Sequence, residues 1–303
     1  MPRMGRAVLP DYPHHIIMSC KDEFAPLCVL TTVPGTWRTI WLLMLLAGCA
    51  WMPDAQVART EVGKYSYIAA GQREPVVIFE ANLGNGKAVW DPVFQKLSRT
   101  TRVFAYDRAG NGESVARSND RSGSQIVKEL HWALEVAGIR PPYVFVGHSL
   151  GRMYAELYAR TYPNEVAGVV FLDGLYRDYV LNCYPITNRA EQFCPASAVM
   201  RETFSKPPNA GVKEYRGMAA TQAQLKDTGP FPPVPFIVIT GTRHITAEPR
   251  DQKWLAAQAE LTKLSPLGRE LRCSTCGFAV QDDDPGLVIG AVLDVVKRAR
   301  EKQ

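Results

Sequence analysis

Short runs of apolar residues alternate along most of the chain with segments whose apolar positions recur at helical spacing. The run at 76–80 is almost entirely apolar, as expected of a strand buried on both faces. Similar β-rich runs occur at 103–107, 143–146, 169–172 and 235–240. This alternation predicts an α/β fold, with a mostly parallel sheet covered by helices on both faces.

Two helices and one interruption complete this pattern. Apolar residues recur at helical spacing from Ile126 to Ala137, Gly138 stands where a helix should end, and a last helix is expected over 287–300. The stretch from about 174 to 233 carries two Cys and several Pro but no clear strand, although it lies between two predicted strands. We interpret it as a cap inserted into the α/β domain.

The first 48 residues differ from the rest. The apolar run at 40–47 is shorter than the roughly 20 residues that span a bilayer, and its length suits the core of a signal peptide. It ends in Leu46, Ala47, Gly48 and Cys49, which resembles the lipobox of bacterial lipoproteins and implies cleavage before Cys49 and lipid on its thiol. The alternative is a buried apolar helix with an incidental cysteine.

This resemblance divides the chain into a signal-bearing extension at 1–48 and a folded domain at 49–303. It predicts an exported lipoprotein, anchored to a bacterial membrane on its periplasmic or extracellular side, with a secreted or periplasmic protein as the alternative. The 36 residues that precede Trp37 look neither like the amino-terminal region of a signal peptide nor like a folded module. We therefore expect the true start to lie further along, with Met18 as one candidate.

Charge and cysteine content narrow the functional classes. The net charge of +5 is spread along the chain without a basic block, so no nucleic-acid partner is predicted. An oxidising compartment would leave an even set of four cysteines after the cut, for which we favour a Cys183–Cys194 disulfide. The spacing of Cys273 and Cys276 also allows a metal or redox motif, but no second ligand pair completes a zinc site, so no metal is predicted.

One sequence motif indicates a catalytic site. The apolar run at 143–146 leads directly into Gly147, His148, Ser149, Leu150 and Gly151, and a helical segment follows. This is G-x-S-x-G in its setting of strand, sharp turn and helix, where the serine sits in a strained turn as the nucleophile. The glycines are needed because larger side chains would collide with the neighbouring strand and helix.

From about residue 64 to 297 the chain resembles the α/β-hydrolase superfamily, in particular its bacterial esterase-like members. The matching segments are 79–84, 106–110 and 141–143, besides the serine motif. The resemblance implies hydrolysis of a small carboxylic ester or related acyl substrate by a Ser–His–acid triad with Ser149 as nucleophile. It also implies an oxyanion hole from the backbone N–H groups of Leu150 and Leu83, although Asn82 stands where relatives usually carry Gly. No cofactor is predicted, because Gly110 and Gly112 lack the third glycine of a dinucleotide loop.

The triad acid should follow a strand that comes after the serine motif. Asp173 follows the apolar run at 169–172 in this manner. The alternative place is the loop after Thr240, where the first acidic residues, Glu248 and Asp251, come late. A helix-capping or turn role is the other interpretation of Asp173.

The chain departs from the family pattern at the histidine that serves as the triad base. Relatives carry the His in a segment that aligns with 276–285, and Phe278 occupies the position of that His. No histidine follows His244, which is the one remaining candidate because it leaves a strand at the catalytic edge. His148 is expected to pack near the serine turn, and His131 to lie at the surface or rim.

The sequence therefore leaves two functional hypotheses. The first is a serine hydrolase with Ser149, Asp173 and a base at His244 or elsewhere. The second is a non-catalytic α/β-hydrolase-fold protein that keeps the pocket as a binding site after losing its His.

Overall fold

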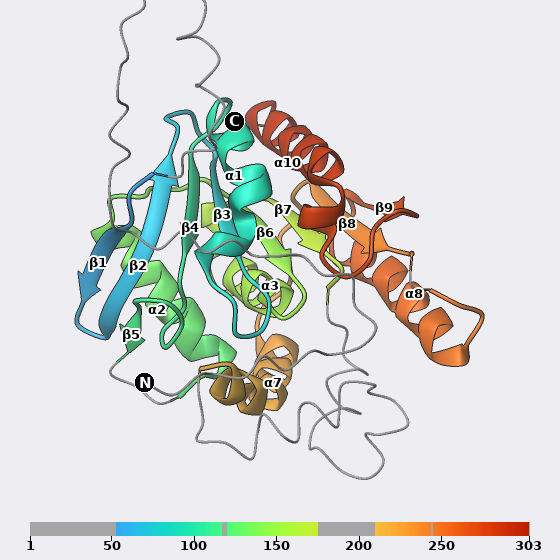
Figure 1. Cartoon of the computed structure of the whole chain (residues 1–303), viewed down its shortest axis with the longest axis horizontal. Coiled ribbons are helices and arrows are strands. Elements are labelled where there is room, and N and C mark those ends of the chain that lie inside the picture. Colours follow the sequence, from blue (N-terminus) through green and yellow to red (C-terminus); the bar gives the residue numbers. More distant parts are fainter. Residues whose placement is uncertain (1–52, 117–119, 175–209, 244, 303) are drawn as a thin grey trace, which may run out of the picture. The chain divides into compact units, whose positions relative to one another are not determined.

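The computed structural model describes residues 53–116, 120–174, 210–243 and 245–302. Within them a twisted sheet runs in the order β1-β2-β4-β3-β6-β7-β8-β9, and β5 pairs with β2 (Figure 1). Pairings from β4 through β3 to β9 are parallel, and those of β2 are antiparallel. The strands are β1 Gln56–Thr60, β2 Gly63–Ala70, β3 Val76–Glu80, β4 Val103–Tyr106, β5 Val115–Ala116, β6 Tyr143–His148, β7 Val166–Leu172, β8 Phe236–Gly241 and β9 Gly268–Cys273.

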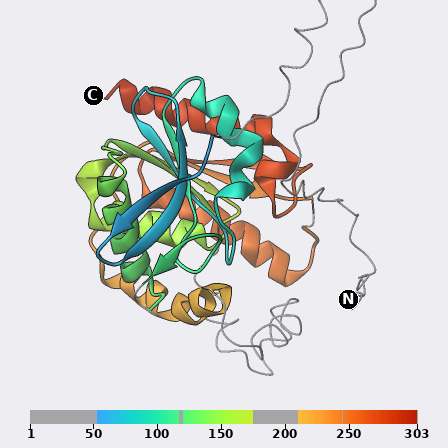
Figure 2. The same ribbon diagram turned by 60° about the vertical axis from the view of Figure 1, so that its left-hand side comes forward.

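Helices cover both faces of this sheet, as the alternating pattern predicts. Figure 2 shows α10 on one side of the sheet and α2 and α3 on the other. The helices are α1 Asp91–Ser98, α2 Gly123–Val136, α3 Gly151–Thr161, α7 Ala210–Asp227, α8 Pro249–Leu261, α9 Val280–Asp283 and α10 Pro285–Arg300, with short 3₁₀ turns η1 Lys87–Trp90, η2 Pro163–Glu165 and η3 Thr262–Leu264.

The central strands supply two separate apolar cores. Successive side chains of a strand point to opposite faces, so Ile78 and Phe145 pack with α2 and α3. Val77 and Val146 pack with α1 and α10 on the other face. Every residue of β3, β4 and β6 is buried, which explains why these strands are continuous apolar runs.

Of the predicted cap, the structure describes only its last part. Helix α7 lies within 174–233 and packs against α2 and α3. Residues 175–209 and 1–52 lie outside the described residues, and with them the predicted Cys183–Cys194 disulfide and the predicted lipidation site Cys49. No helix of the described parts of the chain combines the length and the apolar character needed to cross a membrane.

Candidate active site

Ser149 occupies a sharp turn between β6 and α3. Its backbone φ is 52°, in the left-handed region that non-glycine residues rarely adopt. A Cβ added to Gly151 would lie 2.2 Å from the carbonyl oxygen of Glu80 and 2.5 Å from that of Ala81. A Cβ on Gly147 would lie 2.8 Å from Cα of Arg152. Both glycines are therefore steric requirements of a turn that brings the serine against the loop after β3.

The loop after β3 and the residue after Ser149 carry the two predicted oxyanion donors. Leu150 is fully buried and Leu83 is half-buried. Among the described residues, neither backbone N–H has a hydrogen-bond acceptor. By contrast, the N–H of Gly84 donates to Glu214 Oε2 at 3.2 Å and that of Asn85 donates to the carbonyl of Asn82. Within the described part of the chain, the N–H of Leu83 is therefore a donor without an acceptor.

Asp173 follows β7, the strand next to β6. His148 is in register with Leu172, so Ser149 and Asp173 leave neighbouring strands at the same edge. Asp173 also has a left-handed backbone, with φ of 44°. Its Oδ1 accepts a hydrogen bond of 3.2 Å from Nε1 of Trp254, whereas its Oδ2 is buried without a partner among the described residues.

Burial controls the protonation of this carboxyl. Desolvation raises the pKa of Asp173 to about 7, and hydrogen bonds from Trp254 and the backbone of Gly241 only partly oppose the shift. An unused carboxylate oxygen at the catalytic edge is what a triad acid needs in order to orient an imidazole. Asp251, the alternative acid, instead accepts hydrogen bonds from the N–H and Oγ1 of Thr246 at the start of α8.

Phe278 stands in the loop before α9. Its side chain is 44% exposed, and its carbonyl oxygen lies 2.9 Å from Nε2 of His148. The two rings pack with centroids 4.7 Å apart. Since the carbonyl can only accept, Nε2 carries the proton in this contact.

His148 packs beside the serine turn, as the sequence predicts. Burial lowers its pKa to about 4, so the imidazole is neutral near pH 7. Its Nδ1 is buried without a partner among the described residues, but the low pKa makes it a poor general base. His131 stacks on Tyr162, and its Nε2 lies 3.1 Å from Glu165 Oε1, so it is half-buried between α2 and the end of α3. His244 lies outside the described residues.

A disulfide joins Cys273 and Cys276 just before Phe278. The backbone N–H groups of Thr242 and Arg243 donate to the carbonyls of Cys273 and Cys276, which ties this loop to the end of β8. Cys273, Cys276 and Asp284 form a group with metal-ligand spacing. Sulfurs bonded to each other are not thiolates, so the residues as they stand do not fit a metal ion.

A buried ion cluster lies behind the loop after β3, and sequence reasoning missed it. The guanidinium of Arg108 pairs with Glu80 at 3.2 Å and with Glu214 of α7 at 2.8 Å. Burial raises the pKa of Glu80 to about 7, although Arg108 and a hydrogen bond from Tyr106 oppose the shift. Arg108 belongs to a segment that the family resemblance already covers, but nothing near Glu214 marks it as a partner.

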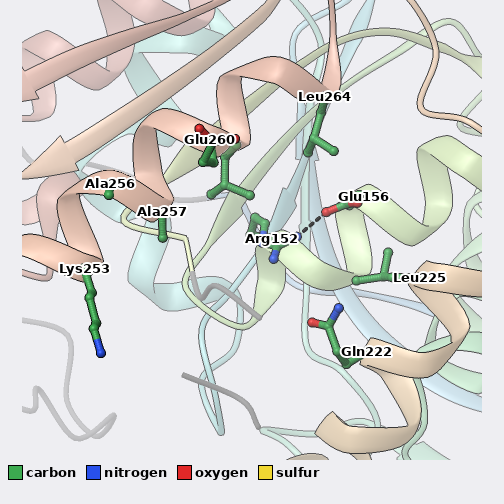
Figure 3. Close-up of a pocket in the computed structure, with 10 residues that line it drawn as sticks. Arg152, Glu156, Gln222, Leu225, Lys253, Ala256, Ala257, Glu260 and Leu264 are labelled. Carbon is green, nitrogen blue, oxygen red and sulfur yellow. Dashed lines mark hydrogen bonds and ion pairs between the residues drawn. The ribbon is translucent and has the colours of Figure 1, made fainter. Parts of the chain in front are cut away.

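A cavity of about 480 Å³ lies between α3, α7 and α8 (Figure 3). Arg152 and Glu156 of α3 form an ion pair in its wall and face Leu225 of α7. Its other lining residues are Gln222, Lys253, Ala256, Ala257, Glu260, Leu261 and Leu264. Because neither Ser149 nor Asp173 lines it, this cavity is separate from the predicted catalytic groups.

Comparisons with known proteins agree with this architecture. Residues 74–198 match a family model described as the alpha/beta hydrolase fold. YqjL of Bacillus subtilis, an uncharacterized protein, is 25% identical over 226 residues, which cover 74% of this chain and 85% of that protein. RutD of Shigella dysenteriae is 33% identical over 118 residues, but these cover 38% of this chain and 52% of RutD.

A solved structure gives the same result over a longer stretch. A thermophilic esterase from Thermogutta terrifontis superposes with a TM-score of 0.60 at 16% identity, and the match covers 82% of this chain and 99% of the esterase. At this identity the likeness establishes the fold alone. The predicted fold class is thereby confirmed.

Proposed function

We propose that this chain, an α/β-hydrolase-fold protein, is a serine hydrolase that acts on a carboxylic ester or a related acyl substrate. The observation that carries the proposal is the conformation of Ser149. A left-handed backbone at a non-glycine residue costs on the order of 1 kcal/mol or more, and such residues concentrate at functional sites. Here two glycines and a buried strand hold the serine in that conformation.

In the proposed reaction, Oγ of Ser149 bonds to the acyl carbon while its proton passes through the base to the leaving oxygen, so that the ester C–O bond breaks and the alcohol of the substrate is released. Water then attacks the resulting acyl-serine, which releases the carboxylic acid and returns the proton to Oγ. The negative oxygen of each tetrahedral intermediate would receive hydrogen bonds from the N–H groups of Leu150 and Leu83. Both donors lack other acceptors among the described residues, which supports this assignment.

Asp173 is the proposed triad acid, and His244 is the proposed base. The buried, unpartnered Oδ2 of Asp173 favours it as the group that would orient an imidazole. The imidazole itself is missing from its usual place, because Phe278 occupies that position. His244, which follows the end of β8, is the residue that we propose as base.

The rate of ester hydrolysis depends on the histidine that position 278 lacks. Serine without a general base is a weak nucleophile, while an oxyanion hole and substrate binding alone can retain about 10³–10⁴-fold over the reaction in water. We therefore expect slow but measurable ester hydrolysis unless His244 acts fully as the base.

A second candidate function rests on the same residue. Phe278 exposes 44% of an aromatic side chain at the catalytic edge, and its neighbour His148 stays neutral. This surface favours an apolar ligand that binds beside the serine without being hydrolysed. A non-catalytic binding protein is the alternative to the hydrolase.

Hydrolysis of a short-chain nitrophenyl ester separates the two functions. The wild type is compared with Ser149→Ala and with Phe278→His. Turnover that Ser149→Ala abolishes supports the hydrolase. A wild type that matches Ser149→Ala, together with a Phe278→His variant that gains activity, supports the binding protein instead.

The lipobox-like segment motivates a proposal on location. Cys49 would carry lipid and anchor the domain to a bacterial membrane on its periplasmic or extracellular side. The apolar run at 40–47 and the lipobox-like sequence that ends at Cys49 support this proposal. An ester-hydrolysing domain held there would meet small acyl substrates outside the cytoplasm.

A further inference from the structure

The guanidinium of Arg108 uses all five of its N–H donors inside the protein. Two bonds reach Glu214, at 2.8 and 2.9 Å, and one reaches Glu80 at 3.2 Å. The remaining two reach the carbonyl oxygens of Ala81 and Asn82, each at 2.8 Å. The side chains of the three charged residues are 2% exposed or less. This group, here called the Arg108 cluster, is therefore isolated from water and fixed in one geometry.

These contacts determine how one peptide plane is oriented. The carbonyl of Asn82 and the N–H of Leu83 belong to the same peptide unit, which is planar and trans, so they point in opposite directions. Arg108 Nη2 holds the carbonyl and so turns the N–H of Leu83 away from the cluster. The next N–H, that of Gly84, is held by Glu214 Oε2 at 3.2 Å. Hydrogen bonds to the Asn82 carbonyl and from the Gly84 N–H therefore fix the orientation of the peptide that carries the predicted oxyanion donor.

The loop that Arg108 holds also contacts the turn that carries Ser149. The carbonyls of Glu80 and Ala81 lie so close to Gly151 that a Cβ there would overlap both. Because Gly151 begins α3, directly after the serine turn, any shift of the loop after β3 changes its distance from Ser149.

We propose that Arg108, itself set by Glu214, is the residue that positions the oxyanion hole, an inference that rests on the proposed serine hydrolase function. Glu214 belongs to α7, which lies in the segment between β7 and β8. The seating of α7 against α2 and α3 therefore sets the donor geometry at Leu83. Neither Arg108 nor Glu214 touches substrate in this account.

Amide hydrogen exchange tests the positioning directly and needs no activity. In Glu214→Gln the charge that holds Arg108 is lost, so exchange of the peptide covering residues 81–86 should rise by at least about tenfold. Arg108→Lys should do the same, because an ammonium cannot reproduce the planar fork.

Glu129→Gln is the matched control. Glu129 pairs with Arg121, both side chains 3% exposed, in a second buried ion pair that makes no hydrogen bond or ion pair to the loop at 81–86 within the described parts of the chain. This variant should lose stability like Glu214→Gln while the exchange of residues 81–86 stays at the wild-type rate. If the Arg108 cluster acted on stability alone, Glu214→Gln and Glu129→Gln would affect ester hydrolysis equally, and Arg108→Lys would leave the exchange of residues 81–86 unchanged.

Ester hydrolysis supplies the second readout. In enzymes with an oxyanion hole, loss of one donor lowers kcat by about 10²–10³-fold. A misaligned N–H of Leu83 should therefore lower kcat at least about tenfold in Glu214→Gln, with KM within about twofold of the wild-type value. Glu129→Gln should leave both constants unchanged.

The two readouts separate the two proposals. If the wild type hydrolyses no ester, the proposed function fails, and hydrogen exchange still decides the positioning. Unchanged exchange at 81–86 in folded Glu214→Gln and Arg108→Lys overturns the positioning whatever the activity. If Glu214→Gln does not fold, Arg108→Lys decides by the same two measurements.

Discussion

Ser149 and Asp173 are the two non-glycine residues with a left-handed backbone among the described parts of the chain. They leave neighbouring strands at one edge of the sheet. The sequence predicts both positions, because each follows a continuous apolar run. It does not predict that Asp173 bonds to Trp254, since the two residues are far apart in the chain and only the packing of α8 brings them together.

The raised pKa of Asp173 gives a stability prediction with a definite sign. The folded-state value of about 7 exceeds the ordinary value of 3.8, so the folded protein holds this proton more tightly than the unfolded chain. The contribution is present below about pH 4 and is lost as pH rises to about 7. Relative to Asp173→Asn, the wild type should lose at most about 4 kcal/mol of unfolding free energy over that interval. Chemical unfolding of both proteins across the pH range measures it, and parallel profiles would refute the assignment.

Two glycine substitutions distinguish a required glycine from a tolerated one. In Gly151→Ala the new Cβ would meet two carbonyl oxygens of the loop after β3, so the unfolding free energy should fall by about 2 kcal/mol or more and ester hydrolysis should fall with it. In Gly290→Ala nothing lies within 4 Å of the new Cβ inside α10, so stability should rise by about 0.5–1 kcal/mol. Denaturant titrations decide, and equal effects of the two would contradict this account of the turn.

The strands that the sequence predicts are those whose residues are almost all buried. Strand β3 matches its predicted range, and β4, β6, β7 and β8 differ only at their ends. Strand β9 was not predicted, because it lies at the sheet edge and its residues are mostly polar and half-exposed. Strand β1, at the opposite edge, was missed for the same reason. A pattern of apolar runs detects strands buried on both faces. It passes over the edge strands and also over β2, which lies inside the sheet but has half-buried ends.

The disulfide of Cys273 and Cys276 closes a loop of only a few residues between β9 and Phe278. Chain entropy then predicts that Cys273→Ser/Cys276→Ser lowers the unfolding free energy by about 1–2 kcal/mol, less than a long loop would cost. Unfolding titrations of the variant and the wild type under oxidising conditions measure the difference. A loss well above about 4 kcal/mol would show that the bridge does more than constrain the unfolded chain.

The location of the folded domain depends on Cys49. If its thiol carries lipid, the expressed protein should sediment with the membranes of a bacterial host, and Cys49→Ala should release it or leave the signal segment uncleaved. Metabolic labelling with a radioactive fatty acid should mark the wild type and not the variant. Label in both proteins, or a wild type found entirely in the soluble fraction, would remove the anchor from the account.

If Ser149 is a nucleophile, an acyl-serine should form on it and can be trapped. A weak or absent base slows the removal of the acyl group as well as its formation, so a nitrophenyl ester should leave a detectable acyl-enzyme. Peptide mass spectrometry after incubation with nitrophenyl butyrate is expected to find the butyryl group on the peptide containing Ser149, and no such adduct in Ser149→Ala. A wild-type peptide that stays unmodified, or one modified equally in Ser149→Ala, would contradict the account.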